Sequence, residues 1–281
     1  MRNVRQLVAL ITIFGVTCAA YGGGTNNVNA SSTAVKPATQ LATPAIAAAQ
    51  PRATTVEPAV NTEELVLPYQ AVYRAKYNGM DIEAHHSMSA NDDGTFIEQT
   101  EARNFLGRIE ESAVFSVTDT GTVQPRHYLY KRSIVGVKKT ETIDFDWDAL
   151  QANYANGKKN QTVALTPGVL DNVTVKLQIR LDLKQGRDQF DYNIAKRGSV
   201  KENDYRLLGR EILNTDLGQL KTLKLERVHD SDKRRTIIWL AEEWDNLLVQ
   251  LEHEENDETY TLYVSSASVN NNPVTGLSPE A

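Results

Sequence analysis

A strict alternation of apolar and polar residues, followed at once by a turn, most constrains how this chain folds. The stretch YQAVYRAKY covers residues 69–77, and every second side chain in it is tyrosine or alanine: Tyr69, Ala71, Tyr73, Ala75 and Tyr77. Because successive side chains of a strand point to opposite faces, this pattern predicts a half-buried β-strand. Asn78-Gly79 comes directly after it. Both residues tolerate positive φ, so the pair is a strong signal for a β-hairpin.

Further turn sequences recur along the chain. They are NDDG at 91–94, TDTG at 118–121, NG at 156–157 and DSDK at 230–233. Residues 246–266 repeat the alternation on both sides of an acidic turn. Turns spaced by roughly 8–12 residues are typical of antiparallel sandwiches and barrels. We therefore predict a mainly β fold: one antiparallel, strongly curved sheet or open β-barrel built from consecutive hairpins.

One segment fits two structures. In GVLDNVTVKLQIRLDLKQG, residues 168–186, every second residue from Val173 to Leu183 is apolar, which is a strand pattern. Leu170, Val173, Leu177 and Leu181 also recur at helical spacing, after Pro167. Periodicity favours the strand here, and one short helix near 169–184 is the alternative.

The N-terminus has the three-part layout of a secretory signal peptide. MRNVRQ carries two arginines, and the apolar run at 7–20 is short for a bilayer span and ends in Ala19 and Ala20, which offer cleavage positions. We predict a signal peptide over 1–20 and a periplasmic location. The alternative is a membrane-anchored protein that faces the periplasm. Membrane association is expected only through this signal, or through Cys18 if it is retained.

Cys18 is the only cysteine of the chain. Gly15, Val16 and Thr17 precede it and match a lipoprotein signal poorly, so lipidation of Cys18 is the minor alternative. Residues 21–62 are rich in Ala, Thr, Pro and Asn and carry few large apolar side chains, which predicts a disordered linker. We place the β-rich domain at 63–270 and a disordered tail at 271–281.

An acidic stretch, ETIDFDWDAL at 141–150, is the first candidate for chemistry. Asp144, Asp146 and Asp148 alternate with Ile143, Phe145 and Trp147, as on a half-buried strand with one wet face. A calcium loop would need Gly and Glu where Ala149 and Ala155 stand. A glycosidase pair has a compatible spacing but lacks any sign of a desolvated carboxyl. The pattern therefore favours a solvated face.

Other motifs for catalysis or cofactor binding are missing from the sequence. His85 and His86 are adjacent, so on a strand they point to opposite faces and do not chelate one metal together. The sequence has no HExxH, CxxC, G-x-S-x-G or phosphate-binding glycine loop. The formal charge of −6 and the lack of a basic cluster argue against nucleic acid as a partner. We expect no catalytic residue, cofactor or metal, and hence a protein that is not an enzyme.

Four stretches resemble the bacterial family known as domain of unknown function 3108. They are FDWD at 145–148, LTPGVLDNVTVKLQIRLDL at 165–183, YRLLGREILNTDLGQLKTLKLER at 205–227, and residues 234–266. The resemblance extends from about Leu67 to Ala267. It implies a mostly β protein exported to the periplasm of a Gram-negative bacterium, with no assigned activity and with a helix near 169–184. No catalytic residue is implied.

Two functions of different kinds are compatible with these observations. In the first, a curved sheet binds a lipid, a lipoprotein anchor or another apolar envelope ligand in a cavity lined by aromatic residues: Tyr69, Tyr73, Tyr77, Trp239 and Trp244. The same residues would instead fill a packed core if no cavity exists. In the second, the domain is an envelope-integrity scaffold that contacts another envelope protein through its edge strands. A hydrolase that uses the three aspartates is the least favoured reading.

Overall fold

The computed structural model describes residues 65–77, 80–256 and 258–277, which all belong to one compact unit. Before the helix, the strands are β1 (Tyr69–Tyr77), β2 (Met80–Ala90), β3 (Phe96–Asn104), β4 (Gly107–Val117), β5 (Val123–Ile134), β6 (Val137–Asp146), β7 (Gln151–Ala155) and β8 (Asn160–Ala164). Then come α3 (Thr174–Lys184), β9 (Gln189–Lys196), β10 (Ser199–Thr215), β11 (Gly218–Val228), β12 (Arg234–Ala241), the 3₁₀ turn η2 (Glu242–Trp244), β13 (Leu247–Glu255), β14 (Glu258–Val269) and β15 (Asn272–Pro273).

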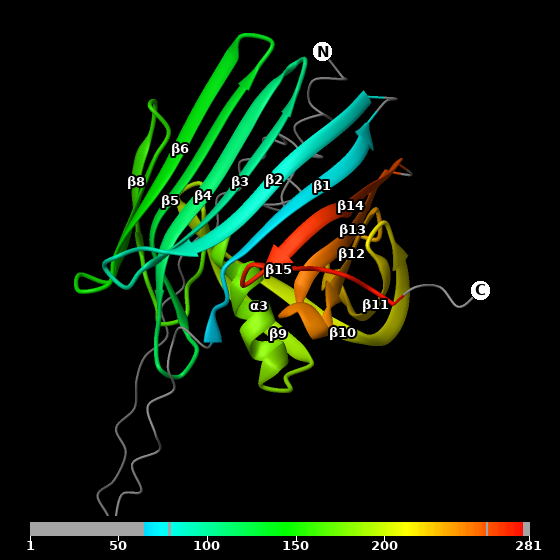
Figure 1. Ribbon diagram of the computed structural model, residues 1–281. Helices are drawn as coiled ribbons and strands as arrows, with labels where there is room; N and C mark the ends of the chain where they lie inside the picture. Colours follow the sequence, from blue (N-terminus) through cyan, green and yellow to red (C-terminus); the bar gives the residue numbers. More distant parts are fainter. Residues whose placement is uncertain (1–64, 78–79, 257, 278–281) are drawn as a thin grey trace, which may run out of the picture. The chain divides into compact units, whose positions relative to one another are not determined.

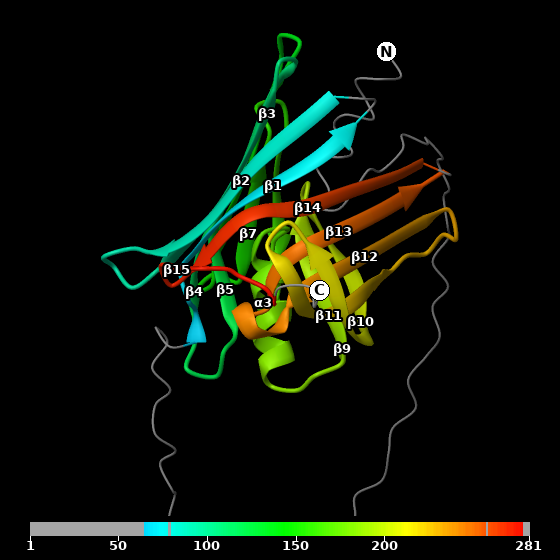
Figure 2. The ribbon, with the colours of Figure 1, turned by 45° about the vertical axis from the view of Figure 1, so that its right-hand side comes forward.

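All these strands belong to one antiparallel sheet that does not close. Its order is β8-β7-β6-β5-β4-β3-β2-β1-β14-β13-β12-β11-β10-β9, and β15 pairs with β14. Strands β1–β8 each pair with their neighbours in sequence, and so do β9–β15, whereas β8 and β9 lie at the two ends of the order and do not pair. The pairing of β1 with β14 joins the two series. We call β1–β8 the N-terminal half of the sheet and β9–β14 the C-terminal half. Figures 1 and 2 show that the sheet curves strongly, with α3 beside the two halves. The predicted fold class is confirmed.

Residues 174–184 form a helix, so the strand favoured by periodicity is wrong and the helical alternative is right. Oδ1 of Asp171 accepts hydrogen bonds from the backbone N–H groups of Val173 and Thr174, at 2.7 and 2.9 Å. Oγ1 of Thr174 accepts one in return from the N–H of Asp171. This reciprocal cap satisfies donors that a helix start leaves unpaired. Most of the helix is buried, which explains why its apolar residues show no single face.

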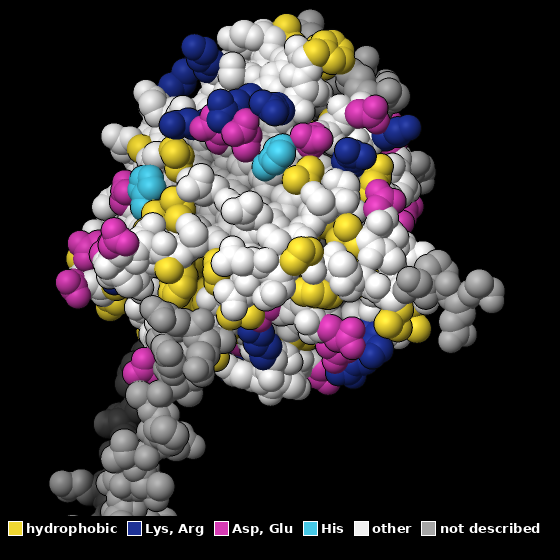
Figure 3. Space-filling model, viewed as in Figure 1, with side chains coloured by type: hydrophobic (Ala, Val, Ile, Leu, Met, Phe, Trp, Pro, Cys, Tyr) yellow, Lys and Arg dark blue, Asp and Glu magenta, His cyan; other side chains and the backbone are white. Residues whose placement is uncertain are grey.

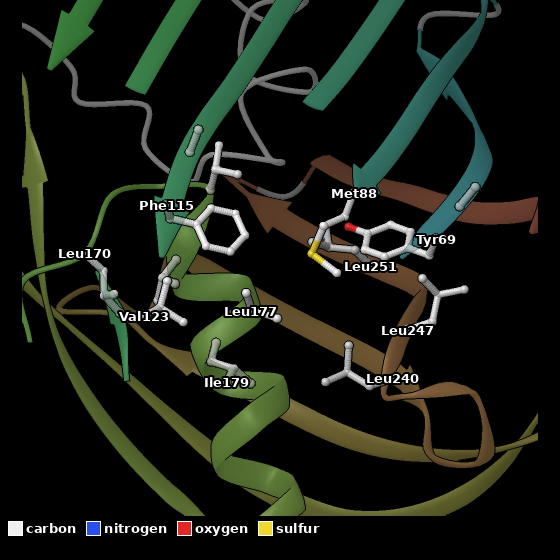
Figure 4. Close-up of a cluster of buried hydrophobic side chains, with 14 of the residues drawn as sticks. Tyr69, Met88, Phe115, Val123, Leu170, Leu177, Ile179, Leu240, Leu247 and Leu251 are labelled. Carbon is white, nitrogen blue, oxygen red and sulfur yellow. The ribbon is translucent and has the colours of Figure 1, made fainter. Parts of the chain in front are cut away.

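The core lies between α3 and the inner face of the sheet. Figure 4 shows Leu177 and Ile179 of α3 surrounded by side chains from both halves, among them Phe115, Val123, Leu240 and Leu251. Phe115 and Val123 are fully buried, and Leu177 is 1% exposed. Burial of this apolar surface from both halves holds the curved sheet and the helix together.

The chain remains ordered beyond the sheet's last long strand, which corrects the expectation of a disordered tail from residue 271. Val274 is 3% exposed, and the N–H of Gly276 donates to the carbonyl oxygen of Leu217 at 2.7 Å. Leu277 and Gln219 exchange two backbone hydrogen bonds. Burial of one apolar side chain and these bonds fix residues 272–277 against the C-terminal half.

The predicted signal peptide (1–20), Cys18 and the predicted linker (21–62) lie outside the described residues. Within the described ranges, no helix combines the length and the apolar character needed to cross a membrane.

Candidate binding cavity

A cavity of about 70 Å³ lies between α3 and the inner face of the sheet. Apolar side chains from α3 and the C-terminal half form most of its wall: Val175, Ile179, Ile238, Leu240, Leu247, Leu248 and Leu251. Tyr69 and Tyr73 of β1 line it from the N-terminal half, and Figure 4 shows Tyr69 close to Leu247 and Leu251. The remaining lining residues are polar: His86, Glu98, Asn172, Lys176, Arg180, Asn203 and Tyr205. The lining of the cavity thus combines apolar side chains with several polar and charged ones.

The residues predicted to line a cavity do not all meet there. Tyr69 and Tyr73 line it, whereas the side chain of Tyr77 lies outside the described part of the molecule. Trp239 does not line it: its indole N–H donates to Glu211, and Lys224 Nζ lies 5.0 Å from its ring centroid. Trp244, in η2, packs against the core without reaching the cavity. Trp239 follows Ile238 and precedes Leu240, both of which line the cavity, so alternation turns it to the other face of β12.

A buried ionic group forms part of the polar lining of the cavity. His86 Nε2 lies 2.7 Å from Oε1 of Glu98, and Lys176 Nζ lies 3.3 Å from the same oxygen. The hydroxyl of Tyr69 lies 3.2 Å from His86 Nε2. The side chains of His86 and Glu98 are 3% and 1% exposed. Charges this far from solvent persist only when partners compensate them.

The pKa shifts of this group follow from burial and from Lys176. Burial first, and then the charge of Lys176, lower the pKa of His86, so the imidazole is neutral near pH 7. Burial opposes ionisation of Glu98, but Lys176 and the hydrogen bond from His86 outweigh it and lower the pKa of the carboxyl below its usual range. Neutral His86 therefore donates through Nε2–H to an ionised Glu98.

Arg180 forms the second ionic contact of the cavity. Its Nε donates to the carbonyl oxygen of Asp245 at 3.0 Å, and its guanidinium pairs with the carboxylate of Asp245. Its Cζ lies 4.9 Å from the ring centroid of Tyr69, a cation–π contact. Lys184 also pairs with Asp245. Lys176 and Arg180 are four residues apart on α3, so one face of the helix carries both cations into the cavity.

Sequence reasoning missed Glu98, Lys176, Arg180 and Asp245. Glu98 alternates with Phe96 and Thr100 on β3, and all three are buried. A charged residue at a core position of an alternating strand is the signal that would have identified Glu98. No such signal existed for Lys176 and Arg180, because their segment fitted a strand as well as a helix.

The acidic stretch lies on the surface. Asp144, Asp146 and Asp148 are exposed, whereas Ile143 is 2% exposed. Asp144 pairs with His127 at 2.6 Å, and Oδ1 of Asp146 accepts from the N–H of Ala149 at 2.9 Å. Among the described residues, no group of three or more His, Cys, Asp or Glu is arranged to hold a metal ion. Figure 3 shows acidic and basic side chains interspersed on the face it displays.

The comparisons with known proteins concern family and fold. The family model described as "Protein of unknown function (DUF3108)" matches residues 72–265, more than half of the 281 residues. The chain therefore belongs to this family, as the sequence motifs predicted. No curated protein matches the chain. A crystal structure of a β-barrel-like protein of the domain of unknown function DUF1849 from Brucella abortus is similar, with a TM-score of 0.50 and 8% identity over 73% of this chain and 98% of that chain. At this identity the similarity concerns the fold alone.

Proposed function

We propose that this member of the DUF3108 family is an exported, non-enzymatic protein of the bacterial cell envelope that binds an apolar ligand between α3 and the inner face of the sheet. The cavity carries this proposal. Leucine and isoleucine side chains of β12 and β13 line it together with residues of α3 and of β1. Concave sites with mostly apolar walls and a few convergent polar groups are typical of small-molecule binding.

The volume limits what the cavity holds. Pockets for drug-sized ligands measure roughly 300–1,000 Å³, whereas this cavity measures about 70 Å³. It accommodates a short apolar molecule or the end of a longer chain. A complete lipid would need α3 or the side chains of β12 and β13 to move apart.

Export and location rest on the sequence of residues 1–20, with its arginines, apolar run and small residues at the end. Either a lipid or a lipoprotein anchor would offer an apolar chain end in the envelope. The polar lining residues would then contact whatever polar group lies next to that chain.

Native mass spectrometry on the full chain, produced with export in a Gram-negative host and purified without detergent, tests the binding proposal. A co-purifying mass of an aliphatic compound, absent from the Leu240→Phe variant, is the expected result. Phe at this position fills the cavity, because Leu240 is 5% exposed and lines it. A clean apo mass that persists after incubation with short-chain aliphatic compounds would contradict ligand binding.

A scaffold that acts through protein contacts is the second candidate. The observation that favours it is the position of β8, which pairs only with β7 among the described strands and so offers a free edge for strand addition. Photo-crosslinking from Thr162, an exposed-edge residue of β8, would capture an envelope protein in intact cells if this candidate is correct. Crosslinking from Gln99 in the paired strand β3 is the control.

A further inference from the structure

The two carboxylate oxygens of Glu98 differ in their contacts. His86 and Lys176 both approach Oε1, at 2.7 and 3.3 Å. Oε2 is buried and accepts no hydrogen bond from the described residues, although the hydroxyl of Tyr69 lies near the carboxylate. Glu98 is 1% exposed and lines the cavity. A buried, ionised carboxylate oxygen without a donor is costly, and such an oxygen in a native protein calls for a specific explanation.

The charges around the cavity restrict the donor that Oε2 can accept from. Lys176 and Arg180 are two cations on α3, and Glu98 and Asp245 are the two carboxylates paired with them. An ammonium ligand would meet Lys176 and Arg180, so like charges disfavour it. A carboxylate ligand would meet Glu98 itself. A neutral hydroxyl group avoids both penalties, and an O–H donor bonds strongly to a carboxylate.

The apolar lining residues determine the chemistry of the remainder of the ligand. Leu240, Leu247 and Leu251 line the same small cavity as Glu98, and each is at most 5% exposed. A ligand whose hydroxyl reaches Glu98 therefore places its carbon chain against these leucines. The small volume of about 70 Å³ favours a short chain.

We propose, resting on the binding function above, that the cavity selects neutral hydroxyl-bearing amphiphiles, in which an alcohol O–H donates to Oε2 of Glu98 and a short aliphatic chain packs on Leu240, Leu247 and Leu251. The donor complements an oxygen that the protein itself leaves without a hydrogen bond. Glu98 is thereby the residue that determines specificity. An ether of the same size offers no donor and is discriminated against.

The test compares 1-pentanol with butyl methyl ether, which has the same number of non-hydrogen atoms but no O–H. Both are titrated into the full chain carrying ¹³C-labelled leucine methyl groups, and the shifts of Leu240, Leu247 and Leu251 report binding. The alcohol is expected to bind more tightly than the ether by about tenfold or more, the ratio for one hydrogen bond to a charged group. Equal affinities for both compounds would overturn the selectivity while leaving apolar binding intact. If neither shifts the leucine methyls, the binding function itself fails.

Two variants test whether Glu98 causes the preference for the alcohol over the ether. Glu98→Gln places an amide N–H₂ where a carboxylate oxygen stands, so the preference for the alcohol is expected to disappear. Glu101→Gln is the matched control, because Glu101 lies on the same strand but pairs with Arg108 at the surface. Alcohol selectivity that survives in a folded Glu98→Gln protein would overturn the role of Glu98. Should Glu98→Gln not fold, the comparison of alcohol with ether on the wild-type chain decides alone.

Discussion

Arg180 of α3 and Asp245 of the turn before β13 form an ion pair that is almost completely buried. The two side chains are 6% and 5% exposed. Asp245 takes a left-handed conformation, with φ of 58°, and so turns both its carbonyl oxygen and its carboxylate toward the guanidinium. Asn246 adds a hydrogen bond from its Nδ2 to the carbonyl oxygen of Arg180 at 3.2 Å. The pair fixes the helix to the C-terminal half of the sheet.

Asp245→Asn is therefore expected to destabilise the protein by about 3–5 kcal/mol, because Arg180 keeps its charge in a buried site without the carboxylate. Asparagine tolerates the left-handed conformation, so the loss reflects the charge rather than the backbone. Urea unfolding followed by fluorescence measures the change. Asp232→Asn, in the exposed turn before β12, is the control and should alter stability by no more than about 0.5 kcal/mol. Equal stabilities of the two variants would mean that the ion pair does not hold the helix.

Leu240→Ala should enlarge the cavity and lower the stability together. Leu240 is 5% exposed and lines the cavity, so its truncation is expected to cost about 2–5 kcal/mol. The same change should let a longer aliphatic chain enter, which native mass spectrometry would detect as an increase in the mass of the bound compound. Leu208→Ala is the control, since Leu208 is 44% exposed. If the Leu240→Ala protein is destabilised but binds the same ligands, Leu240 does not determine which ligand enters the cavity.

Replacing Asp144, Asp146 and Asp148 together by Asn should leave both folding and ligand binding unchanged. All three side chains are exposed. Asn keeps an acceptor for the N–H of Ala149, which bonds Asp146 at present. Surface changes of this kind usually shift stability by less than about 0.5 kcal/mol each. Loss of a cellular function in a fully folded triple variant would revive a catalytic reading of these residues.

The protein should lose stability in mild acid through a pair of histidines on the C-terminal half. Nε2 of His229 and Nδ1 of His253 lie 2.9 and 2.8 Å from the hydroxyl of Thr236. Burial, followed by the nearby Arg227 charge, lowers the pKa of His229 to about 4. Burial likewise lowers the pKa of His253. Near pH 5 the unfolded chain thus binds more protons at these two positions than the folded protein does.

The lowered pKa values of His229 and His253 stabilise the folded protein fully above about pH 6.5, and this stabilisation is lost as the pH falls toward 4. Because His229 is only half-buried, we expect a discounted loss of about 1 kcal/mol between pH 7 and pH 5. Urea unfolding at both pH values measures it. His229→Gln should reduce the slope with pH. A steeper slope in His229→Gln would contradict this assignment.

Local sequence patterns predicted the hairpins but not the pairs between distant segments. The alternation in residues 69–77 and the turn after it correspond to β1 and β2, paired from Tyr69 with Met88 to Tyr77 with Met80. The pairing of β1 with β14 joins Tyr69 to Val269, and no local pattern encodes a partner that far along the chain. The curved sheet was predictable because consecutive hairpins imply it. The pairing of β1 with β14 at the centre of the sheet was not predictable.

The candidate site was only partly predictable for a related reason. Tyr69 and Tyr73 share the buried face of a strand whose other face is polar, so alternation assigned them to the interior. In β12, by contrast, Ile237, Trp239, Leu240 and Ala241 are all buried. When both faces of a strand are covered, apolar content does not reveal which face meets a cavity. Trp239 was therefore placed on the wrong side.

The pairing of β1 with β14 has a consequence for how the chain is completed during its synthesis. Each of these strands is flanked by the other and by its own hairpin neighbour, so strands from near the two ends of the described chain meet in the middle of the sheet. β1 is synthesised long before β14. The backbone N–H and C=O groups on the edge of β1 that faces β14 therefore cannot form these hydrogen bonds until β14 has been synthesised. A stop codon before Glu258 would thus remove the strand that joins the two halves into one sheet, and only the core around α3 would still hold them together.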